Sequence, residues 1–291
     1  MHTTASATSA HAAPAPHPGE PTRCPLTWRG RAIEVEFAWV GRPDAAAPCL
    51  VFLHEGLGSV SMWRDFPHQL CTTLGWRGLV YSRPGYGQST PRPAHEHWQP
   101  DFMHQQALEV LPALLKALGL DDPATPPWLF GHSDGGSIAL LHAALAPTVG
   151  ATPPAGIVVL APHVMVEDVS VTSIQAARQA YLQTHPQPTL KQRLARHHAD
   201  PDSAFWGWND VWLSPAFRSW DIRPVLSRIT CPVLAIQGLD DEYGTQAQIR
   251  DIQQHAPQTR LRELPDCGHS PHKDQAEAVV RAVRVWVGEV R

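Results

Sequence analysis

The sequence lacks any apolar run approaching the roughly 20 residues that a membrane-spanning helix requires, so it predicts no transmembrane segment. An excess of positive charge is also missing, because Asp and Glu number 27 against 23 Lys and Arg, for a formal net charge of -4. Proteins that bind nucleic acid or an anionic membrane surface usually carry a basic stripe. Neither of these is therefore an expected partner.

Cysteine is scarce, and its pattern predicts no structural role. The chain has five cysteines, an odd number, without a close C-x-x-C pair. This arrangement indicates neither a disulfide framework nor a zinc ribbon, and we expect reduced thiols in a cytoplasmic protein. Histidine is abundant, with 17 residues, but none has the spacing of a metal-binding motif such as H-E-x-x-H. The sequence predicts no metal ion and no cofactor.

The first 22 residues consist mainly of Ala, Thr, Ser, His and Pro. They lack both the basic start and the continuous apolar block of a secretory signal peptide. Such a composition buries too little apolar surface to fold, so residues 1–22 are expected to form a disordered tail.

The rest of the chain alternates short apolar runs with helical patterns. A continuous apolar run is typical of a strand covered on both faces, and strands separated by helices indicate parallel pairing. The expected fold class is α/β, with a mostly parallel central sheet covered by helices on both faces. The expected strands are 32–40 near a sheet edge, 49–53, 79–81, 128–131, 156–160, 232–237 and 260–264. The expected helices are 61–74, 101–120, one ending near 146, 245–255 and 272–287.

The alternation breaks between residues 165 and 222, where helical patterns and an aromatic-rich segment occur without a buried strand. We expect residues 165–222 to form a helical cap. This cap would be inserted between two parts of one core, residues 23–164 and residues 223–291.

The segment Gly131-His132-Ser133-Asp134-Gly135 connects an apolar run to a helical pattern. A sharp strand-to-helix turn needs glycines on both sides of its central residue, because a Cβ atom there would collide with the neighbouring element. Ser133 would stand exposed at this turn, and the free N–H groups of the following helix would favour negative charge beside it. The pattern predicts a nucleophilic serine.

The ends of the expected strands bring further reactive groups to the same edge of the sheet. The loop after 232–237 carries the carboxylates Asp240 and Asp241, and the loop after 260–264 carries His269. A serine hydroxyl becomes a useful nucleophile when an imidazole takes its proton and a carboxylate holds that imidazole in the correct tautomer. The chain supplies one group of each kind, in the order Ser, Asp, His.

Together these motifs resemble the α/β-hydrolase superfamily, in particular its capped serine hydrolases. The resemblance covers the chain from about residue 30 onward and implies Ser133 as nucleophile and His269 as base. It also implies Asp241 as the acid, three residues after the glycine that ends its strand, with Asp240 as the alternative. The remaining options are the acids after the preceding strand, Glu167 and Asp168.

The resemblance further implies an oxyanion hole made of two backbone N–H groups. One belongs to Asp134, directly after the serine, and the other to the turn His54-Glu55-Gly56. The family usually has His-Gly at this turn, whereas here Glu55 stands in the place of the first glycine. Gly56 is therefore the expected donor, and Glu55 is the alternative. The Glu55 carboxylate would either orient a substrate or water molecule or face solvent as a loop residue.

Substrate contacts are expected from the cap and from one strand end. Phe205, Trp208 and Trp212 have the spacing to share one face of a helix. They would either pack the cap onto the sheet or form an aromatic wall around an apolar or aromatic substrate. His163 follows a strand at the entry to the cap and is a further expected contact.

A serine nucleophile implies an acyl-enzyme formed from a small-molecule carboxylic ester, thioester or lactone. One alternative is a C–C bond hydrolase of aromatic-ring meta-cleavage products. That activity would need cationic groups for the substrate carboxylate, for which Arg178 and Arg193 are available in the cap. A second alternative is a ligand-binding homologue without catalysis, which would have no need of the serine, acid and histidine together.

Overall fold

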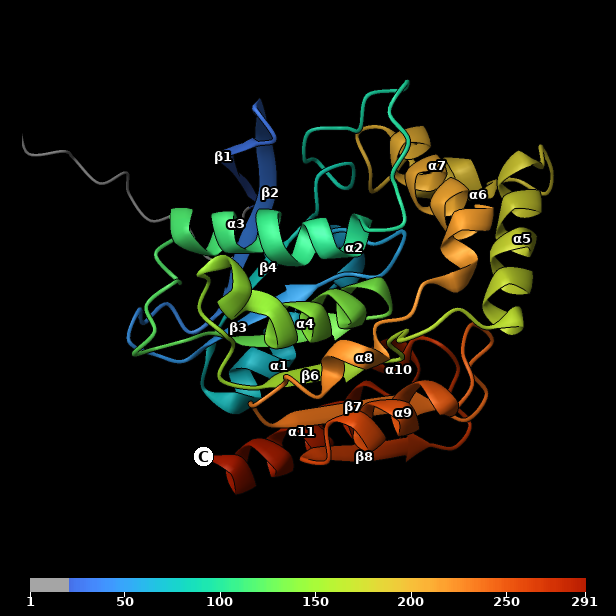
Figure 1. The fold of residues 1–291 in the computed structure, drawn as a ribbon. Coiled ribbons are helices and arrows are strands. Elements are labelled where there is room, and N and C mark those ends of the chain that lie inside the picture. The colour runs from blue at the N-terminus through green and yellow to red at the C-terminus, as the bar shows by residue number, and fades with distance from the viewer. Residues whose placement is uncertain (1–20) are drawn as a thin grey trace, which may run out of the picture.

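The computed structural model describes residues 21–291. The predicted disordered tail lies outside the described residues except for Pro21 and Thr22. Thr22 is already the first residue of a strand, so the ordered part of the chain begins inside the range predicted for the tail. Figure 1 shows a central sheet with helices on both of its faces.

An eight-stranded sheet forms the centre of the described chain, in the order β1-β2-β4-β3-β5-β6-β7-β8. Strand β2 is antiparallel to both of its neighbours, and all pairs from β4 to β8 are parallel. The predicted fold class is confirmed. The strands are β1 (Thr22–Trp28), β2 (Arg31–Gly41), β3 (Cys49–Leu53), β4 (Arg77–Tyr81), β5 (Trp128–His132), β6 (Ile157–Leu160), β7 (Val233–Gly238) and β8 (Thr259–Leu264).

Strand β1 was not predicted, and its surroundings explain the omission. It lies at the sheet edge, where only Cys24 is fully buried, and it contains Pro25. Such an edge strand has little apolar periodicity of its own and depends on its partner for its conformation. Here a tight turn at Arg29 and Gly30 allows it to pair with β2 along its whole length.

Helices cover both faces of the sheet. The face covered by α1 and α11 is packed with residues such as Phe66, Leu70 and Trp286. The opposite face is covered by α3, α4, α8 and α9. Their bounds are α1 (Phe66–Leu74), α3 (Leu111–Ala117), α4 (Asp134–Leu145), α8 (Arg223–Leu226), α9 (Ala247–His255) and α11 (Ala276–Val290).

Three of the predicted helices are interrupted. The one predicted for 61–74 is a 3-10 turn at Ser61–Trp63 followed by α1, with Arg64 at a positive φ of 53° between them. The one predicted for 101–120 is α2 (Phe102–Gln105), a π-helical turn and α3. The closing helix is α10 (Pro271–Asp274) followed by α11, because Gln275 has a non-helical conformation.

The segment between β6 and β7 leaves the sheet and returns to it at one point. Met165 and Asp221 form an isolated antiparallel bridge, and the Ile222 N–H donates to the Val164 carbonyl at 2.8 Å. Between them lie α5 (Asp168–Leu182), α6 (Leu190–Leu194), α7 (Pro201–Trp212) and the 3-10 turn Pro215–Ser219. Figure 1 shows α5, α6 and α7 grouped at one end of the molecule, the end toward which β7 and β8 point.

Within residues 21–291, no helix combines the length and the apolar composition that crossing a membrane would require.

Candidate active site

The order of the strands brings the predicted site residues together. Strands β3, β5, β6, β7 and β8 are successive neighbours in the sheet and run in parallel. Their carboxyl ends therefore form one row. The loops that follow carry Glu55, Ser133, His163, Asp241 and His269, in that spatial order.

Ser133 lies at the tight turn between β5 and α4, with φ 52° and ψ −121°. A Cβ atom added to Gly131 would lie 2.2 Å from the Gly135 carbonyl oxygen, and one added to Gly135 would lie 2.0 Å from the Leu53 carbonyl oxygen. The predicted need for both glycines is confirmed. The predicted exposure of Ser133 is wrong, since the residue is only 6% exposed. Ser133 lines a cavity whose wall also includes Trp208 and Trp212 of α7.

A continuous series of hydrogen bonds links the serine, the histidine and one aspartate. Ser133 Oγ lies 3.0 Å from His269 Nε2, and His269 Nδ1 lies 2.8 Å from Asp241 Oδ1. Because a carboxylate can only accept, the imidazole proton belongs on Nδ1 and leaves Nε2 free to accept the serine proton. The arrangement is suited to drawing a proton from the hydroxyl.

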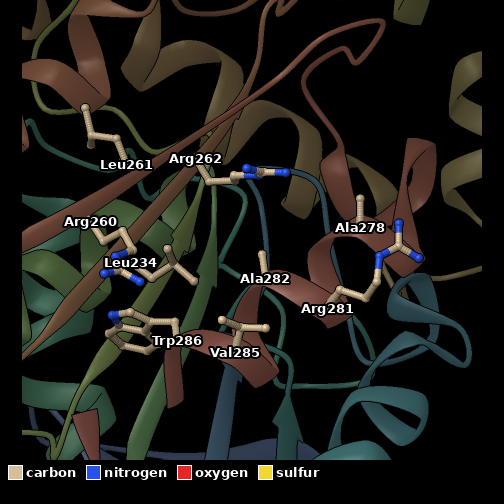
Figure 2. Close-up of a pocket in the computed structure, with 9 residues that line it drawn as sticks. All are labelled: Leu234, Arg260, Leu261, Arg262, Ala278, Arg281, Ala282, Val285 and Trp286. Atoms are coloured by element: carbon tan, nitrogen blue, oxygen red, sulfur yellow. The ribbon is translucent and has the colours of Figure 1, made fainter. Parts of the chain in front are cut away.

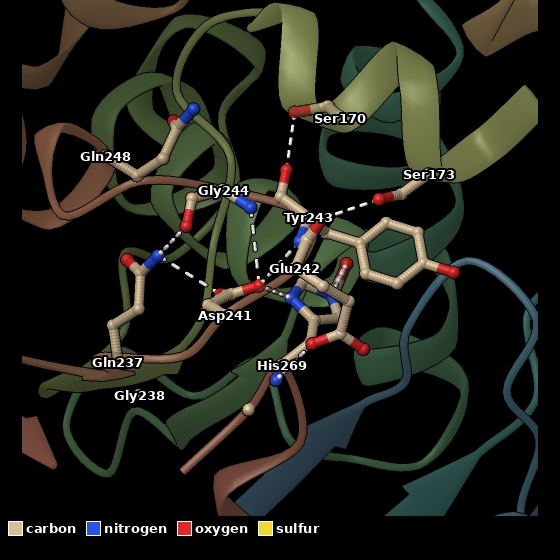
Figure 3. A network of polar contacts seen from close by, with 12 residues as sticks. Ser170, Ser173, Gln237, Gly238, Asp241, Glu242, Tyr243, Gly244, Gln248 and His269 are labelled. Atoms are coloured by element: carbon tan, nitrogen blue, oxygen red, sulfur yellow. Dashed lines mark hydrogen bonds and ion pairs between the residues drawn. The ribbon is translucent and has the colours of Figure 1, made fainter. Parts of the chain in front are cut away.

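Asp241 is held by several further donors (Figure 3). Its Oδ1 accepts from the N–H of Tyr243 at 2.8 Å, and its Oδ2 accepts from Gln237 Nε2 at 3.1 Å. Burial alone would raise the pKa of this carboxyl, but the bonds from His269 and the Tyr243 N–H outweigh it and lower the pKa. Asp241 is therefore ionised at neutral pH.

The alternative acids lie elsewhere. Asp240 is exposed to solvent. Glu167 accepts from the Thr245 N–H at 2.9 Å and from Gln248, and Asp168 forms an ion pair with Arg218. None of the three carboxylates contacts the imidazole of His269.

Helix α5 holds the loop that carries Asp241. Ser170 Oγ donates to the Tyr243 carbonyl and Ser173 Oγ donates to the Glu242 carbonyl, both at 2.5 Å (Figure 3). No local sequence pattern indicates a role for these serines, because their partners lie about 70 residues away in the chain.

The main chain of His269 is fixed from two sides. Its N–H donates to Glu242 Oε2 at 3.1 Å, and its carbonyl accepts from His132 Nε2 at 2.7 Å. On the other side of the His132 ring, Nδ1 is 3.7 Å from Glu55 Oε2, and Glu55 Oε1 is 3.4 Å from Lys273 Nζ. These contacts hold the main chain of His269 and thereby help to fix the position of its imidazole.

The Glu55 side chain is only 17% exposed, so it does not simply face solvent. Burial opposes its ionisation, but Lys273 and His132 outweigh this effect and hold its pKa well below the ordinary value. No sequence pattern indicates this cluster, because Lys273 and His132 lie on different elements.

His163, the expected substrate contact, lines the same cavity as Ser133 and lies beside His269. Its ring centroid is 5.7 Å from that of His269 and 4.9 Å from that of Trp212. Burial, followed by the proximity of His269, lowers its pKa to about 3. His163 is therefore a neutral imidazole at physiological pH.

These residues surround a cavity of about 170 Å³. Trp208, Trp212 and Ile174 come from α7 and α5, whereas Gly56 and Ser133 come from strand ends. Of the three predicted aromatics, Phe205 does not line the cavity. It stacks on Tyr181 with ring centroids 3.7 Å apart and packs α7 against α5.

The two predicted oxyanion donors border this cavity. A Cβ atom at Gly56 would lie 2.2 Å from Trp208 Nε1, so only glycine fits beneath the indole. Asp134 is the first residue of α4, and its N–H is one of those that the helix leaves without an internal partner.

The Asp134 side chain also has a partner. Its Oδ1 accepts from Trp212 Nε1 at 3.2 Å, and burial raises the pKa of the carboxyl to about 6. From the sequence, a role was expected only for the backbone N–H of this residue. Its carboxyl group connects the residue after the serine to helix α7.

A larger hollow, of about 300 Å³, lies between α11 and β8, which is an edge strand of the sheet. Figure 2 shows Arg260, Arg262 and Arg281 around an apolar floor that includes Trp286. None of the predicted site residues lines it. No group of three or more His, Cys, Asp and Glu side chains is placed to hold a metal ion within residues 21–291.

Known proteins share this arrangement of elements. The sn-1-specific diacylglycerol lipase of Mus musculus is 25% identical over 259 residues, which cover 82% of this chain and 81% of that protein. A thermophilic esterase from Thermogutta terrifontis has a TM-score of 0.70 at 20% identity, covering 94% of this chain and 99% of that one. The enol-lactonase from Burkholderia xenovorans LB400 has a TM-score of 0.65 at 20% identity, covering 88% and 97%. At such identities the solved structures demonstrate the shared fold alone.

The family model described as "Alpha/beta hydrolase family" matches residues 50–282. This range includes the glycine-flanked serine, the loop of Asp241 and His269. With the fold and the strand-end loops in the arrangement described above, the chain belongs to the alpha/beta hydrolase family.

Proposed function

We propose that this protein is a serine hydrolase of carboxylic esters, including thioesters and lactones. Ser133 is the nucleophile, His269 the general base and Asp241 the acid that orients it. The observation that carries the proposal is the unbroken path from Ser133 Oγ to His269, at 3.0 Å, and on to Asp241, at 2.8 Å. These separations are within the reach that proton transfer requires.

In the proposed reaction, Ser133 Oγ adds to the ester carbonyl carbon while its proton moves to His269 Nε2. The carbonyl oxygen becomes an anion, for which the N–H groups of Gly56 and Asp134 are the donors. The C–O bond to the leaving group then breaks, and His269 returns its proton to the leaving oxygen. Water, deprotonated by His269, adds to the acyl-enzyme. The bond between the acyl carbon and Ser133 Oγ then breaks, His269 returns the proton to Oγ, and the carboxylic acid is released.

Residues 165–222 are the proposed cap, and the cavity beneath them suggests the kind of substrate. Its volume of about 170 Å³ is below the roughly 300 to 1,000 Å³ of sites for drug-sized ligands. The indoles of Trp208 and Trp212, with Ile174, offer an apolar surface. We therefore propose a small, uncharged acyl group.

Cleavage of C–C bonds in meta-cleavage products is less well supported. Such a substrate carries a carboxylate, yet among residues 21–291 the side chains that line the cavity include Glu55 and Glu242 and no Lys or Arg. Arg178 is 3.6 Å from Asp210 and stacks over Trp206 instead of facing the cavity. Arg193 is exposed. The charges of the site favour a neutral ester.

Fluorophosphonate labelling tests the proposal. We expect the native protein to be labelled at Ser133, as located by mass spectrometry, and to hydrolyse short-chain aryl esters. Ser133→Ala should abolish both, and His269→Ala should slow them by at least about 1,000-fold. Ser270→Ala is the matched control, because Ser270 also lines the cavity but has no part in the proposed relay.

Two results would contradict catalysis at this site. One is a native protein that is neither labelled nor active on esters, which would favour the ligand-binding alternative. The other is a His269→Ala variant that labels as fast as the wild type.

A further inference from the structure

Arg83, in the turn after β4, is a buried cation without a carboxylate partner. It is only 1% exposed, and no ion pair to it is found among residues 21–291. Its guanidinium instead donates to the carbonyls of His54 and Glu55, at 3.0 Å for Glu55, and stacks 4.8 Å from the centre of the Tyr86 ring. Burying a charge costs free energy, and here the charge is directed at two peptide groups.

The Glu55 carbonyl accepts three hydrogen bonds. Besides Arg83 Nη2, it is 2.7 Å from His54 Nδ1 and accepts from the Gly58 N–H at 3.1 Å. The tautomer of His54 follows from its other nitrogen, because Nε2 accepts from the Arg83 N–H at 3.0 Å. The ring proton therefore lies on Nδ1, which donates to the carbonyl.

These bonds determine the direction of the next N–H group. The peptide unit between Glu55 and Gly56 is planar and trans, so its C=O and N–H point in opposite directions. Donors that fix the Glu55 oxygen on one side direct the Gly56 N–H away from Arg83. Gly56 lines the cavity of Ser133, and no hydrogen bond from its N–H is found in the described chain.

We propose that Arg83 is a positioning residue of the oxyanion hole, which orients and polarises the peptide group whose N–H, on Gly56, stabilises the anion. The inference rests on the proposed function. When Ser133 Oγ adds to a carbonyl carbon and its proton moves to His269, negative charge appears on the carbonyl oxygen. The fixed guanidinium, acting through the 55–56 peptide, stabilises this charge more than the uncharged substrate.

The test compares Arg83→Met and Arg83→Lys with the wild type on a short-chain aryl ester. Arg83→Met keeps most of the apolar stem and removes the charge, and kcat should fall about 100-fold with KM within about threefold. Affinity for an aryl trifluoromethyl ketone, whose serine adduct carries an oxyanion, should fall in parallel. Arg83→Lys keeps a positive charge but not the two-pronged contact, and should retain about a tenth of the wild-type kcat.

Arg92→Met is the matched control, because Arg92 also donates to backbone carbonyls, those of Pro93 and Glu96, but does not contact the 54–56 turn. It should leave kcat and ketone affinity unchanged. If Arg83→Met does not fold, as judged by circular dichroism, the kcat and KM of Arg83→Lys serve as the test of the proposal. Wild-type kcat in a folded Arg83 variant, or a loss confined to KM, would overturn the proposal. An inactive, unlabelled wild type would instead refute the proposed function itself.

Discussion

Asp241 and Asp134 are buried carboxyl groups close to the same serine, yet their pKa values shift in opposite directions. Asp241 accepts from an imidazole, an amide and backbone N–H groups, which favour its ionised form. Within residues 21–291, Asp134 accepts a hydrogen bond from the Trp212 indole alone, and burial outweighs the lowering effects of the Arg83 charge and of this bond. The balance of donors and burial therefore decides which of the two carboxyl groups has a lowered pKa and which has a raised one.

Replacing Asp241 and Asp240 one at a time should show which of the two carboxylates the activity depends on. Asp241→Asn leaves an amide that can hold His269 in the wrong tautomer, and kcat should fall roughly 1,000- to 10,000-fold with little change in KM. Asp240→Asn is the matched control and should remain within about twofold of the wild type, because Asp240 is exposed. Steady-state kinetics on an aryl ester measure both. Equal losses in the two variants would contradict the assignment of Asp241.

The raised pKa of Asp134 predicts a pH dependence of stability. A carboxyl whose pKa is higher in the folded state stabilises the fold below its unfolded pKa, near 4, and loses this effect as the pH rises through about 6. Asp134→Asn keeps the acceptor for Trp212 and removes the titration. From pH 4 to pH 7, the unfolding free energy of the wild type should fall relative to this variant, by up to about 3 kcal/mol. Urea unfolding at both pH values measures the difference, and a constant difference would contradict it.

At the scale of elements, helix α5 connects the proposed cap to the loop that carries Asp241. Ser170 and Ser173 donate to consecutive carbonyls of that loop, directly after Asp241 (Figure 3). Ile174 of the same helix lines the cavity. A movement of α5 would therefore affect both the cavity wall and the carboxylate that orients His269.

Removal of the two serine hydroxyls should impair turnover as well as stability. In the Ser170→Ala/Ser173→Ala double variant we expect an unfolding free energy lower by about 1 kcal/mol per hydrogen bond. We also expect kcat to fall about fivefold, because the loop holds Asp241 less firmly. Thr172→Ala is the control, since Thr172 bonds only within α5, to the Asp168 carbonyl. Thermal unfolding and steady-state kinetics measure the two effects. A kcat equal to that of the control would contradict the coupling.

At the scale of the whole molecule, the site is a small cavity between the sheet and the segment 165–222. The sheet supplies the reactive groups, and α5 and α7 supply the apolar wall. Because interiors pack closely, the size of the acyl group depends on how these two layers meet.

The small volume of the cavity predicts a preference for short acyl chains. On aryl esters, kcat/KM should be highest for about two to four acyl carbons and fall at least tenfold by about ten, because longer chains exceed the available volume. Ile174→Ala should shift the optimum to longer chains. Val211→Ala is the control, since Val211 is buried on α7 but does not line the cavity. A wild type that prefers ten-carbon chains would contradict this reading of the cavity.

Local sequence patterns determined most of the sheet and the position of the serine turn. The buried strands are continuous apolar runs, and Gly131 and Gly135 flank Ser133 because no larger residue fits there. The position at strand ends indicated His269 and the pair Asp240 and Asp241, and the family resemblance favoured Asp241, which the structure brings to hydrogen-bond distance of His269. Their catalytic roles remain proposals.

Tertiary structure alone decided the features that depend on distant partners. Strand β1 exists through its pairing with β2, Ser133 is buried because α5 and α7 cover it, and Arg83 contacts a turn about 28 residues earlier in the chain. Periodicity and glycine spacing record the constraints that a residue's own element imposes. They contain no information about which charged group or which helix from a distant part of the sequence packs against the residue, because that depends on the packing of the whole chain.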